Sequence, residues 1–286
     1  MRWRGLAPIA VAAVAAGLSS PAAVSAPASG FAACASQYAV IGLPREKNDG
    51  ADQGPIELCR KGYAVAFNPE TRTPDWVIEH LPEAWLQGKA SRKNNFHADK
   101  DAEGIQTGSS PQNKDYTHSG YDKGHQAPAG DFKSSQPMTD DSFLLTNMAP
   151  QVGIGFNRDI WKQLETDVRG WILCGDRTEL YVITGPVFSE PERWIPKGKN
   201  GRVRVPDAYF KVIYDPKNNR ALGMLLPNQK LNTEDLPDYA VPISEIEEKT
   251  GITFFPALTR RAQNLLKKSD GTLWGSDDSC SKDVEE

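Results

Sequence analysis

The chain of 286 residues carries 33 Lys and Arg residues against 37 Asp and Glu residues, which gives a formal net charge of −4. This length is enough for one large domain with a proper hydrophobic core. The acidic balance argues against a passive nucleic-acid binder, since such a protein is expected to carry a basic face. It does not exclude an enzyme with a small, locally basic cleft.

The first 26 residues have the features of a secretory signal. Arg2 and Arg4 provide the positive start, residues 6–18 are a short apolar run, and residues 24–26 (Val-Ser-Ala) fit the small-x-small cleavage pattern. A transmembrane anchor is the alternative, but the run is too short and too rich in alanine to span a bilayer comfortably. We therefore expect an exported protein, periplasmic or secreted. Its mature form would lose two basic and no acidic residues, for a net charge of −6.

Four cysteines remain after export: Cys34, Cys59, Cys174 and Cys280. An even number in an exported chain indicates two disulfides, with three connectivities open. Cys34–Cys59 and Cys174–Cys280 form the simplest pairing. A zinc site built from four thiolates is the alternative, but the sequence has no Cys-x-x-Cys pair.

Residues 27–55 are expected to form a partly irregular N-terminal segment, and residues 56–286 one folded domain. Residues 58–68 and 75–81 are β-prone and separated by a turn, so a hairpin is expected to open the sheet. Residues 87–112 are polar and irregular. They contain basic residues that usually mark a solvated loop, namely Lys89, Arg92, Lys93 and Lys100.

The middle of the chain combines a short strand with a long amphipathic helix. Residues 140–143 are expected to start a helical turn, and residues 143–148 to form a compact apolar strand. Asn157 stands where a helix N-cap belongs. The helix is predicted from Arg158 to about Ile172, because apolar residues recur at three- and four-residue intervals. These are Ile160, Trp161, Leu164, Val168, Trp171 and Ile172.

The last part of the chain is rich in β-prone segments. Residues 180–187 form a strand ended by Gly-Pro, and residues 209–214 and 221–227 form a second hairpin. A short helix is expected within residues 241–251, where Ser244 and Glu247 have capping-box spacing. Residues 252–256 are a final strand before a polar tail. Strands outnumber helices, which predicts an α+β domain with a central antiparallel or mixed sheet.

One histidine of four stands out in the middle stretch. Only His125 lies in a glycine-containing segment followed by small residues and proline, where a backbone can approach a ligand closely. Phosphodiester cleavage needs a base to activate water, a cation on the phosphate oxygens and help for the leaving alkoxide. With an ordinary pKa of about 6.5, a histidine suits the role of general base.

A magnesium ion could supply the other two functions. Mg²⁺ keeps several waters and takes one or two oxygen ligands, so the Asn157 carbonyl could ligate it directly and Glu165 through water. On a helix, Glu165 diverges from Asn157 by about 80° and Arg169 by about 120°, which leaves Arg169 as an outer residue. The alternatives are an ordinary loop histidine, an ordinary N-cap and a surface i,i+4 pair of Glu165 with Arg169.

Three motifs, in this order, resemble the DNA/RNA non-specific endonuclease family, the Serratia-type and endonuclease G-like group of ββα-metal nucleases. They are D-K-G-H-Q-A-P at residues 122–128, N-M-A-P-Q at residues 147–151 and F-N-R-D-I-W-K-Q-L-E at residues 156–165. The resemblance implies a mostly antiparallel central sheet with a ββα-metal (His-Me finger) core.

The resemblance also implies roles for individual residues. His125 would be the general base and Asn157 the single direct protein ligand of Mg²⁺, with Mn²⁺ as a substitute. Glu165 would orient the metal-bound waters, and Arg169 would stand near the transition-state phosphate. Contacts to phosphates rather than to base edges, with no requirement for a 2′-hydroxyl, would allow cleavage of both DNA and RNA with little sequence preference.

Two basic positions differ from the family pattern or align ambiguously. The family uses an arginine shortly before an aromatic-x-x-Asp segment, and Arg92 offers this group, although Asn94 could occupy the equivalent position. Lys123 replaces the usual arginine of D-R-G-H. Lysine keeps the charge but loses the bidentate fork, so catalysis is expected to survive with altered affinity or rate. Lys123, Arg92 and Arg169 are the candidates for substrate binding.

Other functions and partners stay open at this point. A catalytically silent nucleic-acid-binding or adhesion protein would be expected to lack His125 or Asn157, and both are present. A phosphodiesterase for small nucleotides is the other alternative. DNA and RNA are the expected substrates and no membrane partner is expected, while a homodimer and a protein inhibitor are partners left open.

Overall fold

The computed structural model describes residues 1, 30–46, 54–102, 110–195, 202–269 and 271–275. Apart from Met1, the predicted signal lies outside these residues, and so does Cys280. The described chain has the predicted α+β fold. None of its helices combines the length and the apolar character needed to cross a bilayer.

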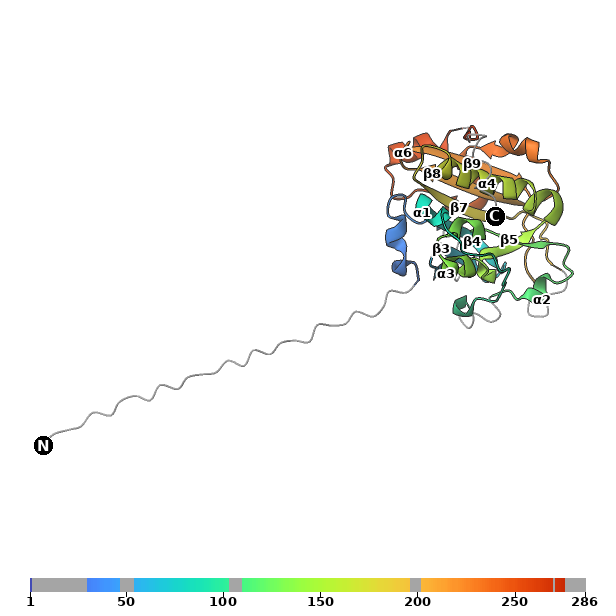
Figure 1. The fold of residues 1–286 in the computed structure, drawn as a ribbon, viewed down its shortest axis with the longest axis horizontal. Coiled ribbons are helices and arrows are strands. Elements are labelled where there is room, and N and C mark those ends of the chain that lie inside the picture. Colours follow the sequence, from blue (N-terminus) through green and yellow to red (C-terminus); the bar gives the residue numbers. More distant parts are fainter. Residues whose placement is uncertain (2–29, 47–53, 103–109, 196–201, 270, 276–286) are drawn as a thin grey trace.

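A seven-stranded sheet forms the centre of the fold (Figure 1), and each neighbouring pair in it is antiparallel. Its central strands bury nearly every residue because both faces are covered. In spatial order the strands are β10 (Ala240–Val241), β9 (Arg220–Pro227), β8 (Ala208–Asp215), β7 (Glu179–Val187), β4 (Thr73–Pro82), β3 (Tyr63–Asn68) and β2 (Ile56–Cys59).

The described chain also contains six α-helices and several short 3₁₀ or π segments. The helices are α1 (Glu83–Leu86), α2 (Asn113–Tyr116), α3 (Gln136–Asp141), α4 (Ile160–Leu173), α5 (Ile243–Thr250) and α6 (Arg260–Lys267). The short segments are η1 (Gly30–Ala33), η2 (Ala35–Tyr38), η3 (Lys100–Ala102), η4 (Ala129–Phe132), η5 (Leu145–Asn147), η6 (Gly153–Asn157) and η7 (Thr233–Tyr239).

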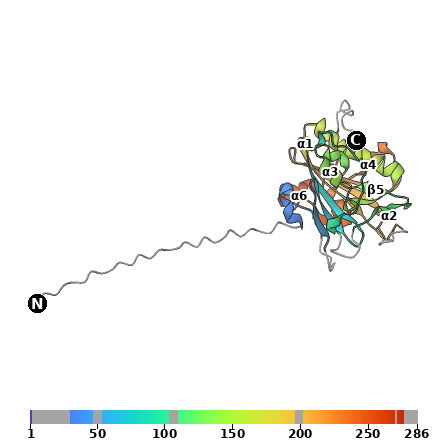
Figure 2. The same ribbon diagram turned by 60° about the horizontal axis from the view of Figure 1, so that its bottom comes forward.

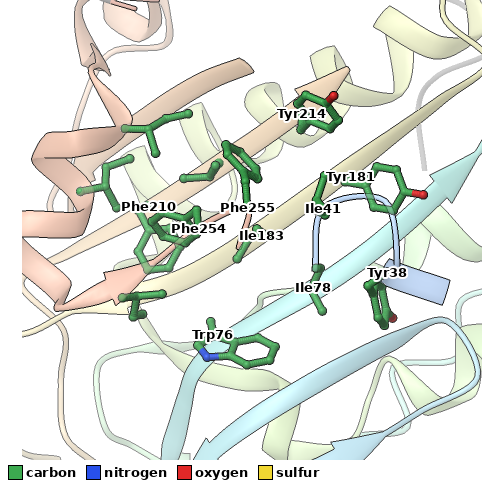
Figure 3. Close-up of a cluster of buried hydrophobic side chains, with 14 of the residues drawn as sticks. Tyr38, Ile41, Trp76, Ile78, Tyr181, Ile183, Phe210, Tyr214, Phe254 and Phe255 are labelled. Carbon is green, nitrogen blue, oxygen red and sulfur yellow. The ribbon is translucent and has the colours of Figure 1, made fainter. Parts of the chain in front are cut away.

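Alternating side chains give the sheet two apolar faces. On β4, Trp76 and Ile78 belong to the core on one face, while Leu81 belongs to the core on the other. The first core, shown in Figure 3, is closed by η2, α5, β11 (Ile252–Thr253) and α6. The second is closed by α4.

Helix α4 packs on β7, β8 and β9 through a stripe of buried residues that includes Trp161, Leu164 and Trp171. Burial of each such side chain is worth about 1.5–3 kcal/mol, so this packing outweighs intrinsic helix propensity. Figure 2 shows α2, β5 (Asp122–His125) and α4 near one another, with α6 on the opposite side of the molecule. The amphipathic helix predicted from Arg158 to about Ile172 is confirmed as α4.

A separate two-stranded sheet places the D-K-G-H motif. Its strands, β5 and β6 (Met148–Gln151), are antiparallel, with His125 opposite Met148 and Asp122 opposite Gln151. Gly124 allows the close approach, because a Cβ at this position would lie 2.1 Å from the buried Gln151 side chain. Asn147 accepts from the Ala127 amide at 3.0 Å and donates to its carbonyl at 2.8 Å. The two motifs are thus locked together by glycine packing and an amide clamp.

The Cys34–Cys59 disulfide is present, as predicted. Cys174 is disulfide-bonded as well, while Cys280, its predicted partner, lies outside the described residues. Another long-range link is the pairing of β1 (Arg45–Glu46) with β11.

Several predicted boundaries were wrong, although both hairpins are confirmed. Residues 58–68 contain two strands, β2 and β3, joined by a tight turn. The strand predicted for residues 143–148 begins only at Met148, because the Asn147 amide bonds back to the Leu144 carbonyl in a 3₁₀ turn. Helix α3 ends at Asp141, where a turn was expected to start.

The C-terminal part differs in its helix ends. The N-cap of α5 is Pro242, so the predicted Ser244–Glu247 capping box does not form. Glu247 instead accepts a hydrogen bond from the Phe254 amide at 2.8 Å. The final strand is only β11, and the polar tail contains α6, whose N-cap hydroxyl on Thr259 accepts from Ala262 at 3.3 Å.

Gly124→Ala is expected to destabilise the protein by about 1–3 kcal/mol, because the added methyl group overpacks against Gln151. Urea unfolding followed by circular dichroism measures this change. Gly54→Ala is the matched control, since a Cβ there meets nothing within 4 Å. Equal unfolding free energies for the two variants would contradict the close packing of the two motifs.

Candidate active site

His125 ends β5 and is 7% exposed. Phe96 lies 5.5 Å and Phe143 5.1 Å from it, measured between ring centroids. Its buried Nε2 atom has no hydrogen-bond partner among the described residues. Burial, reinforced by the positive charge of Arg92, lowers the pKa of His125 to about 3. The imidazole is therefore neutral at ordinary pH, with an unused nitrogen.

Asn157 is held in place by a carboxylate from β5. Its Nδ2 donates to Asp122 Oδ2 at 2.9 Å, and Arg158 donates to both oxygens of the same carboxylate at 2.7 and 2.8 Å. These hydrogen bonds, with the Arg158 bonds the larger effect, lower the pKa of Asp122. Because Asp122 engages the amide nitrogen of Asn157, the carbonyl oxygen is the atom that can ligate a cation.

The predicted N-cap role of Asn157 was wrong. Asn157 ends the irregular turn η6, and the N-cap of α4 is Asp159. Gly155 makes this turn possible with φ of +85°, a left-handed conformation that glycine adopts readily. The helical angles that we counted from Asn157 therefore do not apply, because the residue precedes the helix.

One cavity of about 590 Å³ brings most of the predicted residues together. It is within the size range of ligand sites. His125, Asn157, Glu165, Arg92 and Lys123 all line it. The remaining lining residues are Asn94, Phe96, Tyr116, Thr117, Tyr121, Asp122, Pro128, Arg158 and Lys162.

The charge of this cavity is opposite to that of the whole chain. Four basic side chains line it, those of Arg92, Lys123, Arg158 and Lys162, against the two carboxylates of Asp122 and Glu165. The chain as a whole has a net charge of −4. A local positive field of this kind attracts a polyanion to a protein that is acidic overall.

Arg92 and Lys123, the basic positions that align ambiguously with the family pattern or differ from it, both line the cavity. Arg92 donates from Nε to Asn94 Oδ1 at 2.9 Å, so arginine and asparagine from the same loop line the wall together. Lys123 lies with Nζ 4.6 Å from the Phe96 ring centroid. Partial burial lowers the pKa of Lys123, with Asp122 opposing the shift.

Arg169 is not among the residues that line the cavity. It is 2% exposed and donates from Nη1 to Asp131 Oδ1 at 2.9 Å. Lys211 and Glu79, also buried, belong to the same charged cluster. Burial raises the pKa of Glu79 well above its usual range, and the negative charge of the nearby Asp131 carboxylate adds to this effect. Glu165, 8% exposed, lies on the same helix and reaches the cavity.

The lining residues for which the sequence predicted no role include Asp122, Lys162 and Phe96. Asp122 was part of a quoted motif, and its support of Asn157 was not foreseen. Lys162 stands one helical turn before Glu165, so it could have been found from i,i+3 spacing. Phe96 lies in a loop that composition alone marks as solvated, and no local signal places it against His125.

The oxygen donors of the cavity fit a hydrated divalent cation. The Asn157 carbonyl and the Glu165 carboxylate line the same wall, and such hard oxygen ligands suit Mg²⁺ or Mn²⁺. Among the described residues there is no group of three or more His, Cys, Asp or Glu side chains that could enclose a metal. A cation held here would keep most of its waters.

Comparison with solved structures identifies the class of fold. The EndoG chain of the EndoG/EndoGI complex, a structure that concerns EndoG inhibition, superposes with a TM-score of 0.61 at 30% identity. The match covers 72% of this chain and 87% of the EndoG chain. The fold is that of a ββα-metal nuclease.

The sequence comparisons name the family. The pattern of the DNA/RNA non-specific endonucleases matches residues 44–261. A nuclease of Syncephalastrum racemosum is 40% identical over 72% of this chain and 70% of its own length. The mitochondrial nuclease of Saccharomyces cerevisiae is 38% identical over 75% of this chain and 70% of its own length. Mitochondrial endonuclease G of Bos taurus is 32% identical over 82% of this chain and 84% of its own length.

The chain belongs to the DNA/RNA non-specific endonuclease family. It is therefore a hydrolase that acts on nucleic acids, and a divalent metal is its cofactor.

In the metal-free protein, we expect His125 to titrate far below the ordinary histidine pKa of about 6.5. Its folded-state pKa is about 3, so the ring stays neutral as pH falls through 6 and 5. Side-chain ¹⁵N NMR of the four histidines, assigned with a His125→Gln variant, measures this. A His125 titration midpoint near 6.5 would contradict the buried, cation-flanked environment.

Proposed function

We propose that this protein is an exported endonuclease that uses Mg²⁺ to hydrolyse phosphodiester bonds of DNA and RNA with little sequence preference. The observation that carries the proposal is a single basic cavity lined by His125, Asn157 and Glu165. A histidine with a free ring nitrogen and an asparagine with a free carbonyl oxygen are the two groups that this reaction requires.

His125 is the proposed general base. His125 lines the cavity, and its imidazole would accept a proton from the attacking water. The low pKa keeps the ring neutral, and therefore able to accept a proton, in the free protein. A bound phosphodiester brings negative charge beside the imidazole, which favours the protonated ring. The histidine therefore becomes a stronger base once substrate is present.

Asn157 would hold the metal ion through its carbonyl oxygen, with Glu165 accepting hydrogen bonds from the metal-bound waters. When bound, Mg²⁺ would offset charge on the phosphate oxygens and on the leaving alkoxide, and Mn²⁺ could take the same ligands. Asp122 supports this arrangement, because its hydrogen bond to Asn157 keeps the amide from turning over.

The basic residues have two proposed tasks. Arg92 and Lys123, together with Lys162, would contact phosphates of the substrate strand, which requires no base readout. Arg169 would act from outside the cavity wall. A buried positive charge held by Asp131 can stabilise negative charge that develops at the phosphate without touching it.

Plasmid relaxation and RNA degradation, each with Mg²⁺ and with EDTA, test the activity. We expect cleavage of both substrates with metal, none with chelator, and at least about a hundredfold loss in His125→Ala, since a general base contributes that much. His118→Asn is the matched control. His118 is exposed outside the cavity wall, and asparagine tolerates its left-handed φ of +56°.

Retained cleavage by a folded His125→Ala protein would remove the proposed base. Cleavage of a small nucleotide diester in place of plasmid and RNA would favour the narrower phosphodiesterase. Binding of nucleic acid without any cleavage would indicate a silent member of the fold.

Export is the proposed localisation, in the periplasm or the medium. The Cys34–Cys59 disulfide supports it, because such bonds persist in oxidising compartments. Several of the similar proteins are named mitochondrial, so the N-terminus has to be tested directly. Sequencing the mature protein from its native host should find Pro27 at the start. A chain that still begins at Met1, or that is cut elsewhere for an organelle, would contradict export.

An inhibitor and a homodimer are further parts of the proposal. The similar EndoG structure is a complex with EndoGI, so an inhibitor that covers the basic cavity is the kind of partner proposed for this chain. Light scattering of the purified protein would determine whether two chains associate.

A further inference from the structure

Two phenylalanine rings enclose one side of His125. The His125 and Phe143 rings meet edge to face at 88°, and the Phe96 and Phe143 rings at 82° with centroids 5.0 Å apart. Phe143 is fully buried, whereas Phe96 is half-buried and lines the cavity. Phe96 is therefore the ring that stands between the imidazole and solvent.

The same two rings hold the flanking cations. Lys123 Nζ lies 4.6 Å from the Phe96 centroid, and the Arg92 guanidinium lies 5.6 Å from the Phe143 centroid. Both distances are within the range of cation–π attraction. The candidate base and two candidate phosphate-binding residues thus contact one aromatic pair.

The loop that carries Phe96 is anchored directly after the ring. His97 donates from its amide to the Phe143 carbonyl at 3.2 Å, and its carbonyl accepts from Leu145 at 2.9 Å. Two residues further on, the buried Asp99 accepts from the Thr146 hydroxyl at 2.6 Å. These hydrogen bonds hold the loop against the turn before β6, and they fix the backbone next to the Phe96 ring.

We propose that Phe96 is a positioning residue for the hydrolytic reaction: its ring shields the His125 imidazole from water, fixes its orientation and holds the Lys123 ammonium at the cavity edge. This inference rests on the proposed function of His125 as general base. The inference assigns a role to Phe96, a residue in the polar segment 87–112, whose composition is typical of a solvated loop.

A base-stacking role would be the other reading of an aromatic residue in a nuclease cavity. Lys123 covers one face of the Phe96 ring, and the ring also packs against Phe143 and His125. Contacts to the protein therefore already occupy the surface that a nucleobase would need. This arrangement favours positioning over stacking.

The surroundings of His125 indicate what loss of the ring would change. Arg92 from the loop and Lys123 from β5 place positive charge nearby, while Glu165 from α4 and Asp122 from β5 line the same cavity. Burial is the largest cause of the low pKa of His125, ahead of Arg92. Opening the Phe96 side to water should therefore raise the pKa toward its ordinary value.

The test compares Phe96→Leu with the conservative Phe96→Tyr. Phe96→Met, which keeps volume without a ring, is added in case the leucine variant unfolds. Side-chain ¹⁵N NMR of the metal-free proteins gives the His125 pKa, and cleavage of single- and double-stranded DNA with Mg²⁺ gives kcat and KM. Phe188→Leu is the matched control, because Phe188 is a half-buried ring under Arg204 at 4.7 Å and lies outside the cavity wall.

We expect Phe96→Leu and Phe96→Met to raise the His125 pKa by about one unit or more. Their kcat should fall roughly ten- to a hundredfold, as for misplacement of a catalytic group, with a smaller change in KM. Phe96→Tyr should stay close to the wild type in both measurements. Phe188→Leu should change neither.

Two results would overturn the inference. One is an unchanged His125 pKa and kcat in folded Phe96→Leu and Phe96→Met. The other is a rise in KM, larger for single-stranded DNA, with kcat and pKa unmoved, which would indicate base stacking. If instead His125→Ala still cleaves DNA, the proposed function fails, while the NMR titration still reports whether Phe96 shields the imidazole.

Discussion

The position of helix α4 against the sheet determines the rest of the site, and buried charges fix it together with apolar packing. Lys211 of β8 is 1% exposed, and its Nζ lies 5.1 Å from the centroid of the Trp161 ring, near the start of the helix. Arg169, two turns later, is paired with Asp131. Breaking a buried pair of this kind leaves an uncompensated charge and costs about 3–5 kcal/mol. The helix is therefore held at two places, with Glu165 between them at the cavity wall.

The fold could be predicted where local pattern and burial agree. Residues 180–187, the hairpin that follows them and the amphipathic helix were found because apolar periodicity reflects faces that are in fact covered. Prediction failed where backbone bonds override composition. The apolar residues before Met148 form a turn, because the Asn147 amide bonds to Leu144 and its side chain clamps Ala127. Helix α6 was missed because most of its residues are polar and only one side of it packs on the core.

The sequence motifs named candidate residues for the site, but they carried no information on the physical state of those residues. His125 and Asn157, both named by the motifs, line one cavity. The pKa of His125 departs from the ordinary histidine value because rings and a guanidinium distant in sequence surround it. Arg169 was expected beside the substrate, but its i,i+4 spacing to Glu165 could not show that Asp131 would engage it from another segment. Long-range partners decide such properties, and local spacing carries no information about them.

The pairing of β1 with β11 joins the two ends of the domain, with Arg45 opposite Thr253. Much of one face of the sheet is closed by residues near the C-terminal end, including Ile243, Phe254 and Leu266. During synthesis, the strands made first must wait with part of this face uncovered until the residues from Ile243 onward have left the ribosome. Contacts between such distant segments slow folding and expose apolar surface to aggregation. A chain that stopped short of Ile243 would keep this part of the face open to water.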